Sequence, residues 1–229
     1  MTFLSHLPAL LVVVPMAVAP LIAVLPSRSR LGYALATLTA GLTFVIAVLL
    51  ANQVASQGSM PYEMGSWPVP FGIGLLVTPF SAVMALIISG GSFVALLWGA
   101  KSLESEMGRE HHALFLSCWL LASSGLLGIV VTADAFNAFV FMEISSLASY
   151  VLVATGPKRQ SLTAAFKYLV TGSLGATFYL IGVGYLYMMT GTLNFDDLAA
   201  RLPDVSETTP VLIASGFIIL GLALKAAVF

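Results

Sequence analysis

Residues 136–154 read FNAFVFMEISSLASYVLVA, an unbroken apolar stretch with a single charged residue, Glu143. A helix of about 20 mainly apolar residues crosses the ~30 Å hydrocarbon core of a bilayer. Lipid offers no hydrogen-bonding partner to an open backbone, so a segment that crosses it must be helical. The stretch therefore predicts a transmembrane helix that holds a carboxyl group inside the membrane.

The rest of the chain has the same character. Of its 229 residues, 59% are apolar and 8% are charged, whereas soluble domains carry about 25% charged residues. Seven stretches are long and apolar enough to span a bilayer: 7–26, 31–52, 77–99, 113–132, 136–154, 162–189 and 211–229. These features predict an all-α integral membrane protein with one transmembrane domain, residues 1–229. The last stretch stops at Phe229 without interfacial residues, so we expect truncation at the C-terminus.

The basic residues predict the orientation in the membrane. Connections one, three and five contain Arg28, Arg30, Lys101, Arg109, Lys158 and Arg159, and the even connections contain only Arg201. Because Lys and Arg accumulate in cytoplasmic loops, the odd connections are predicted to be cytoplasmic. The N-terminus is then outside, in a multi-pass protein of the cell's inner (plasma) membrane. The net charge of −1 gives no reason to expect nucleic acid as a partner.

The second connection, residues 53–76, has a different composition. Its centre, GSWPVPFG at 65–72, is rich in Gly, Pro and aromatic residues. Trp and Tyr concentrate at membrane–water interfaces. We expect an ordered, extended loop lying at the outer interface.

Three ionisable residues lie inside predicted spans and carry the functional hypothesis: Glu143, Lys167 and Lys225. A charge near the bilayer centre costs at least about 2.5–3.5 kcal/mol, and such residues usually mark an ion or proton path. Ser146 and Tyr150 follow Glu143 at i+3 and i+7, which places the three on one helix face. Desolvation and a neighbouring cation shift a carboxyl pKa in opposite directions. Glu143 is therefore a candidate proton carrier, with a permanent structural contact as the alternative.

The remaining candidates each have two interpretations. Lys225 is predicted within the last span, either as a switchable proton carrier or as a side chain that reaches the interface. Lys167 is near the start of its span and is either a relay between neighbouring helices or a similar interfacial cation. Asp134 either guards an outer ion entrance or caps the helix that begins after it. No phosphate, flavin, haem or metal-binding motif is present, so we expect no cofactor and no metal.

Several segments resemble a known family. The run TADAFNAFVFME at 132–143 and SLASY at 146–150 resemble the passage into the fifth helix of proton-conducting antiporter-like subunits. AAFKYL at 164–169 and GATFYLIGVG at 175–184 resemble the sixth helix of that family. GLALKAAVF at 221–229 resembles the start of its lysine-bearing seventh helix. The resemblance is greatest to the D-type subunit of Mrp-type sodium/proton antiporters, with antiporter-like subunits of respiratory complex I and membrane-bound hydrogenases as more distant relatives.

The resemblance implies a fold of about fourteen helices built from two inverted repeats of five helices each, of which this chain would be the N-terminal part. It also implies that Glu143 pairs with a lysine, and that Lys225 and Lys167 belong to a hydrated proton path. The chain departs from the family in two respects. Relatives are about twice as long, and Thr78-Pro79 stand where they often have an acidic residue.

The leading hypothesis is proton and monovalent cation translocation, as a membrane subunit of a multisubunit Na⁺(K⁺)/H⁺ antiporter. Its expected partners are other subunits of a heteromeric complex, the lipid bilayer, protons, and Na⁺ or K⁺. We expect a transporter subunit rather than an enzyme. The alternative is a proton-pumping subunit of a respiratory NADH-quinone oxidoreductase or a membrane-bound hydrogenase complex, which would make the chain part of an enzyme. A third hypothesis is a non-transporting assembly protein.

Overall fold

The structure is a computed structural model that describes residues 3–26 and 30–228. Arg28 and Phe229, which enter the predictions of orientation and of the last span, lie outside the described residues. The elements are η1 Phe3–His6, α1 Leu7–Val24, α2 Arg30–Gln57, β1 Met60–Glu63, η2 Met64–Ser66, β2 Gly74–Val77, α3 Pro79–Trp98, α4 Ala100–Glu106, η3 Arg109–His111, α5 His112–Val131, α6 Ala135–Ala154, α7 Gln160–Thr190, α8 Phe195–Val205 and α9 Thr209–Lys225.

The predicted all-α membrane fold is confirmed. Among the described residues, six helices are long and apolar enough to cross a membrane: α1, α2, α3, α5, α6 and α7. The seventh apolar helix, α9, has 17 residues and ends at Lys225, earlier than the predicted end at 229. It ends there because Ala227 adopts a left-handed conformation with φ of 53°, and the Val228 N–H turns back to the Ala223 carbonyl at 3.0 Å.

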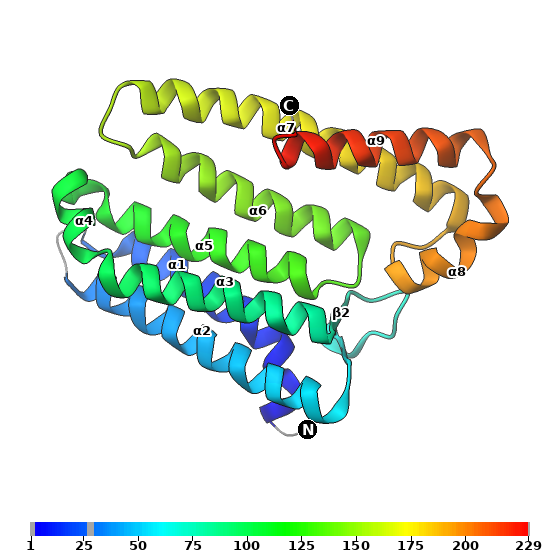
Figure 1. Cartoon of the computed structure of the whole chain (residues 1–229), viewed down its shortest axis with the longest axis horizontal. Helices are drawn as coiled ribbons and strands as arrows, with labels where there is room; N and C mark the ends of the chain where they lie inside the picture. The colour runs from blue at the N-terminus through cyan, green and yellow to red at the C-terminus, as the bar shows by residue number, and fades with distance from the viewer. Residues whose placement is uncertain (1–2, 27–29, 229) are drawn as a thin grey trace.

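The connection predicted as an extended loop is partly regular. Helix α2 continues beyond the predicted end at 52 to Gln57, and Gly58, with φ of 84°, turns the chain out of the helix. β1 and β2 then form an antiparallel hairpin in which Met60 faces Val77. Leu75 also bridges to Thr132 at the end of α5. The hairpin thus lies across one end of the bundle. Figure 1 shows it between α3 and α8.

The helices form a continuous bundle in which α5 and α6 are central. Figure 1 shows α1, α2, α3 and α5 together on one side, α6 beside α5, and α7 with α9 beyond α6. Two buried hydroxyls join α5 to α1: Ser117 donates to the Ala19 carbonyl at 2.7 Å, and Ser124 to the Val12 carbonyl at 2.8 Å. Such bonds are favourable in lipid, because a buried serine hydroxyl has no water there to bond to.

Two glycines of α5 determine which face of α6 points inward. A Cβ at Gly125 would lie 2.6 Å from the Ser145 nitrogen, and one at Gly128 would lie 2.3 Å from the Phe141 ring. The face of α6 that contains Phe141 and Ser145 therefore packs against α5. Glu143, Ser146 and Tyr150 lie on the other side of α6, because successive residues are 100° apart on a helix. They point toward α7 and α9.

Candidate functional site

Glu143 and Lys225 form a direct ion pair between α6 and α9. Lys225 Nζ donates to Glu143 Oε1 at 2.6 Å and to Ser146 Oγ at 2.8 Å. Their side chains are largely shielded, with 13% of Lys225 and 23% of Glu143 exposed. The lysine thus has two oxygen acceptors supplied by one face of α6, and the carboxylate has a charged donor. Partly buried charges need such pairing, since desolvation of a lone ion costs several kcal/mol.

Close packing of α7 and α9 brings Lys225 to this position. A Cβ at Gly221 would lie 2.6 Å from the Tyr179 nitrogen and 2.7 Å from the Gly175 carbonyl. A Cβ at Gly182 would lie 2.8 Å from the Ala214 carbonyl. Glycine is required at both positions because the two backbones nearly touch, as in other membrane helix pairs with small interfacial residues. The close approach directs the end of α9 toward α6.

Tyr150 extends the polar face of α6 beyond the ion pair. It is 5% exposed, and its hydroxyl has no hydrogen-bond partner among the described residues. Its ring packs edge-on against Tyr168 of α7, with ring centroids 4.6 Å apart. Gly172 leaves space for the hydroxyl, because a Cβ there would lie 1.8 Å from the Tyr150 oxygen. The helical periodicity detected this residue as part of the polar stripe, but the sequence did not reveal its missing partner.

Lys167 is not joined to the ion pair. It is exposed on α7 and forms no ion pair or side-chain hydrogen bond within the described ranges. Gly175, which contacts Lys225, lies eight residues further along α7. This separation corresponds to about 12 Å along the helix axis at 1.5 Å per residue. The structure therefore brings together two of the three predicted membrane charges and leaves the third nearer the α6–α7 loop.

Asp134 is the N-cap of α6, one of its two predicted roles. Its carboxylate accepts a hydrogen bond from the Asn137 N–H at 2.7 Å, and Asn137 Nδ2 donates to Thr132 Oγ1 at 3.0 Å. The residue is 9% exposed, and burial raises the pKa of the Asp134 carboxyl, although backbone N–H groups of Asn137 and Phe136 oppose the shift. The role as an ion entrance stays a prediction.

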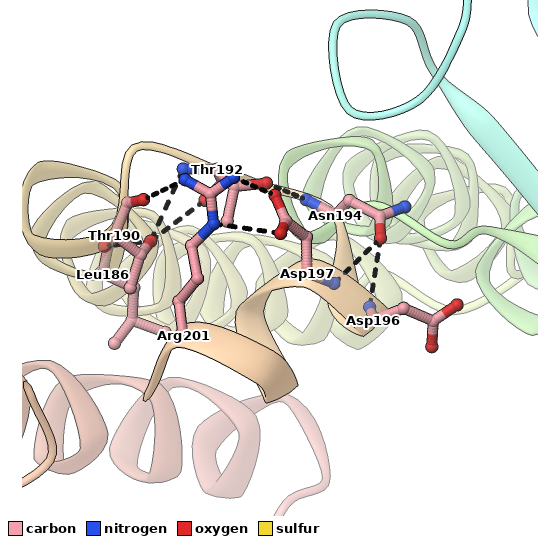
Figure 2. Close-up of polar contacts among 7 residues, drawn as sticks. All are labelled: Leu186, Thr190, Thr192, Asn194, Asp196, Asp197 and Arg201. Carbon is pink, nitrogen blue, oxygen red and sulfur yellow. Dashed lines mark hydrogen bonds and ion pairs between the residues drawn. The ribbon is translucent and has the colours of Figure 1, made fainter. Parts of the chain in front are cut away.

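A polar junction that the sequence did not reveal fixes the short helix α8 to the end of α7 (Figure 2). Asn194 caps α8 by accepting from the Asp196 and Asp197 N–H groups at 3.1 and 3.2 Å. Arg201 pairs with Asp197 at 2.9 Å and donates to the Thr190 carbonyl, also at 2.9 Å. Figure 2 shows the guanidinium lying between these two acceptors. The junction sets where α9 begins its return along α7.

The polar groups gathered here are a carboxylate, an ammonium and two hydroxyls, which are types of group that can exchange protons. Across the described residues, no group of three or more His, Cys, Asp or Glu side chains could hold a metal ion. Glu143, Ser146, Lys225 and Tyr150 instead form a line of groups that accept or release protons.

Comparison with known proteins identifies similar chains. Residues 132–229 match the family described as NADH:quinone oxidoreductase/Mrp antiporter, transmembrane. The chain is 40% identical to NADH-quinone oxidoreductase subunit N of Desulforudis audaxviator, over 98% of this chain and 45% of that protein. It is 30% identical to the D-type subunit of the Na⁺/H⁺ antiporter of Alkalihalophilus pseudofirmus, over 81% of this chain and 37% of that protein. The chain thus spans less than half the length of these relatives.

Solved structures give the same result. A chain of the membrane-bound sulfane sulfur reductase, an archaeal respiratory membrane complex, superposes with a TM-score of 0.86 at 34% identity, over 95% of this chain and 44% of that chain. A chain of the Mrp complex from Dietzia sp. DQ12-45-1b superposes with a TM-score of 0.85 at 28% identity, over 99% of this chain and 42% of that chain.

Proposed function

Because the chain belongs to the NADH:quinone oxidoreductase/Mrp antiporter transmembrane family through residues 132–229, we propose that it translocates protons and a monovalent cation. It would do so as one membrane subunit of a multisubunit Na⁺(K⁺)/H⁺ antiporter. The proposed setting is the inner (plasma) membrane, with the N-terminus outside. The relatives named as antiporter subunits support this assignment.

The contact between Glu143 and Lys225 is the observation that carries the proposal. With both groups charged, the carboxylate stabilises the ammonium at 2.6 Å, and the Ser146 hydroxyl accepts a second of its three N–H groups. Two unit charges 4 Å apart attract by about 4 kcal/mol at an effective dielectric near 20. A proton that arrives on Glu143 removes this attraction and leaves Lys225 as an unpaired cation, which then favours release of its own proton. Proton transfer is thereby coupled to the state of the pair.

Lys167 is proposed to exchange protons on the side of the α6–α7 loop. Its exposed position and its distance of about 12 Å along α7 from the level of Lys225 fit a group outside the central pair. Tyr168, its neighbour in sequence, packs against Tyr150. The polar face of α6 and the Lys167 end of α7 are thus adjacent through the two tyrosines.

Proton/cation exchange in everted vesicles tests the proposal. The host is an antiporter-deficient strain that carries the whole operon, and a ΔpH-sensitive dye follows exchange after addition of NaCl or KCl. Glu143→Gln is expected to lower the rate at least about a hundredfold, in the range for lost proton-transfer groups. Glu207→Gln, an exposed carboxyl before α9, is the matched control and should transport normally.

A second variant separates proton transfer from structural support. Breaking one partner of a buried ion pair costs about 3–5 kcal/mol, whereas replacing both with apolar groups is often neutral. Lys225→Met should therefore destabilise the protein, and Glu143→Gln/Lys225→Met should recover stability but not transport. Recovery of transport in the double variant, or normal transport in Glu143→Gln, would contradict the proposal.

The alternative function is proton pumping within a redox-driven complex. It is favoured by the 40% identity to an NADH-quinone oxidoreductase subunit N and by the superposition on the sulfane sulfur reductase chain. The same residues would act, but the driving force would come from other subunits. Proton uptake that requires NADH or another electron donor, and that ignores added Na⁺ and K⁺, would select this alternative.

A further inference from the structure

An open cavity of about 620 Å³ lies between the start of α5 and the α6–α7 loop. This end of the bundle is opposite the hairpin, which contacts the far end of α5 (Figure 1). One wall is apolar, formed by Leu114 of α5, Val151 and Ala154 of α6, and Leu162 of α7. The other side is polar and includes His111, Lys158 and Arg159. The cavity therefore combines an apolar wall with a pair of adjacent cations.

The two cations are available to a ligand. Lys158 and Arg159 are exposed, and within the described residues neither forms an ion pair. Helix α7 begins directly after them, and its N-cap, Arg159, makes no side-chain capping bond. The partial positive charge of the helix start adds to the two full charges. The lining contains no acidic residue, although Glu110 lies beside Gly108 at the rim.

We propose that this cavity binds the headgroup of an anionic phospholipid. The phosphodiester would lie against Lys158 and Arg159, and an acyl chain would follow the wall of Leu114, Val151 and Leu162. Leu114 is 45% and Leu162 62% exposed, so both side chains extend the wall out to the surface that faces lipid. Basic pockets between transmembrane helices recognise anionic headgroups in this way.

The apolar wall favours a lipid over a soluble anion. Two cations alone would attract inorganic phosphate or a nucleotide equally well, because the electrostatic attraction does not depend on a tail. Burial of each additional methylene of an acyl chain strengthens binding only where an apolar surface continues from the charged site. Here the charges and the wall belong to one cavity at the end of three membrane helices.

Native mass spectrometry of the full chain, purified in detergent with any subunits that stay bound, tests the proposal. The probes are phosphatidylglycerol and phosphatidylcholine with identical acyl chains. We expect phosphatidylglycerol to bind at least about tenfold more tightly, and Lys158→Gln/Arg159→Gln to remove this preference. The matched control Arg30→Gln/Lys101→Gln removes two exposed cations from the same end, outside the cavity, and should retain it.

Two further measurements keep the test decisive. Lys158→Arg preserves the charge and should bind like the unmodified chain, and unchanged thermal unfolding of the glutamine variants would show that they are folded. Inorganic phosphate at millimolar concentration should not displace the lipid. Equal binding of the two lipids, loss of the preference in the control variant, or displacement by phosphate would each overturn the proposal.

Discussion

At the scale of single residues, the Tyr150 hydroxyl is the most unusual group near the ion pair. A buried hydroxyl without a partner costs about 1–3 kcal/mol. Tyr150 nevertheless has such a hydroxyl, which packs against Gly172. Phenylalanine would fill the same space without that cost. The hydroxyl continues the line of Glu143 and Ser146 along the same face of α6.

Tyr150→Phe separates a role in transport from a role in packing. It removes one oxygen and keeps the ring contact with Tyr168. We expect the thermal unfolding midpoint to stay the same or rise, and proton/cation exchange in everted vesicles to fall at least about tenfold. Normal exchange in Tyr150→Phe, alongside a strong defect in Glu143→Gln, would exclude Tyr150 from the path and leave the ion-pair proposal intact.

The buried cap Asp134 makes a prediction about pH. Burial raises the pKa of its carboxyl in the folded protein, so the ionised form is less favourable when folded than when unfolded. The stabilising contribution is full below the ordinary Asp pKa of about 3.9 and is lost as the pH rises through the raised value. Asp134→Asn keeps the cap and carries no charge. We expect it to unfold at a higher temperature than the unmodified protein at pH 8, and the difference to shrink at about pH 4, near the ordinary Asp pKa.

Asp134→Ala is the control for that experiment. It loses the bond to the Asn137 N–H and, like Asp134→Asn, carries no charge, so it should be less stable than Asp134→Asn by about 0.5–2 kcal/mol at both pH values. Thermal unfolding of the purified chains in detergent at the two pH values measures both variants. A gain in Asp134→Asn that does not depend on pH would contradict the assigned effect of burial.

At the scale of elements, glycines decide which helices touch. Gly125 and Gly128 of α5 admit α6, and Gly175, Gly182 and Gly221 bring α7 and α9 into backbone contact. The α5–α6 contact points Glu143 away from α5, and the α7–α9 contact brings Lys225 close to Glu143. The site is therefore a product of two helix interfaces, although its charged atoms come from α6 and α9.

The α7–α9 interface can be tested with two glycines of one helix. Gly182→Val places its Cβ 2.6 Å from Ile218 Cγ1, whereas the position of a Cβ at Gly184 has no neighbour within 4 Å. Overpacking typically costs about 1–3 kcal/mol. We expect Gly182→Val to lower the unfolding temperature and the exchange rate together, and Gly184→Val to change neither appreciably. Equal behaviour of the two variants would argue against the close packing of α7 on α9.

The sequence predicted the elements better than their contacts. Apolar length identified the helix that carries Glu143, because burial in lipid leaves a continuous hydrophobic signal. Apolar length could not show whether Lys225 or Lys167 pairs with Glu143. That choice depends on where α9 crosses α7, and Lys225 lies 82 residues from Glu143 in the sequence. The family resemblance supplied only the expectation of a lysine. Helix α8 was missed because it is short and acidic, and its cap at Asn194 is a loop residue in the sequence.

At the scale of the whole molecule, the distribution of charge separates the two ends of the bundle. Lys101, Lys158 and Arg159 lie at the end where α5 and α7 begin, together with Arg30 at the start of α2. The hairpin, α8 and the start of α9 form the other end, with Arg201 paired to Asp197. Cytoplasmic loops are enriched in Lys and Arg. The end with Lys101, Lys158, Arg159 and Arg30 is therefore the proposed cytoplasmic side, and it also contains the proposed lipid site.

Cysteine labelling tests this orientation, because the chain has a single native cysteine, Cys118, which is buried in α5. In a Cys118→Ala background, Asp204→Cys on α8 should react with a membrane-impermeant maleimide in right-side-out vesicles. Lys101→Cys on α4 should react only in inverted vesicles, since both replaced side chains are exposed and differ in the side they face. Detergent permeabilisation, which should label both variants fully, is the control for intrinsic reactivity. The opposite labelling pattern would put the N-terminus and the hairpin in the cytoplasm, and would move the Lys158–Arg159 cavity to the outer leaflet.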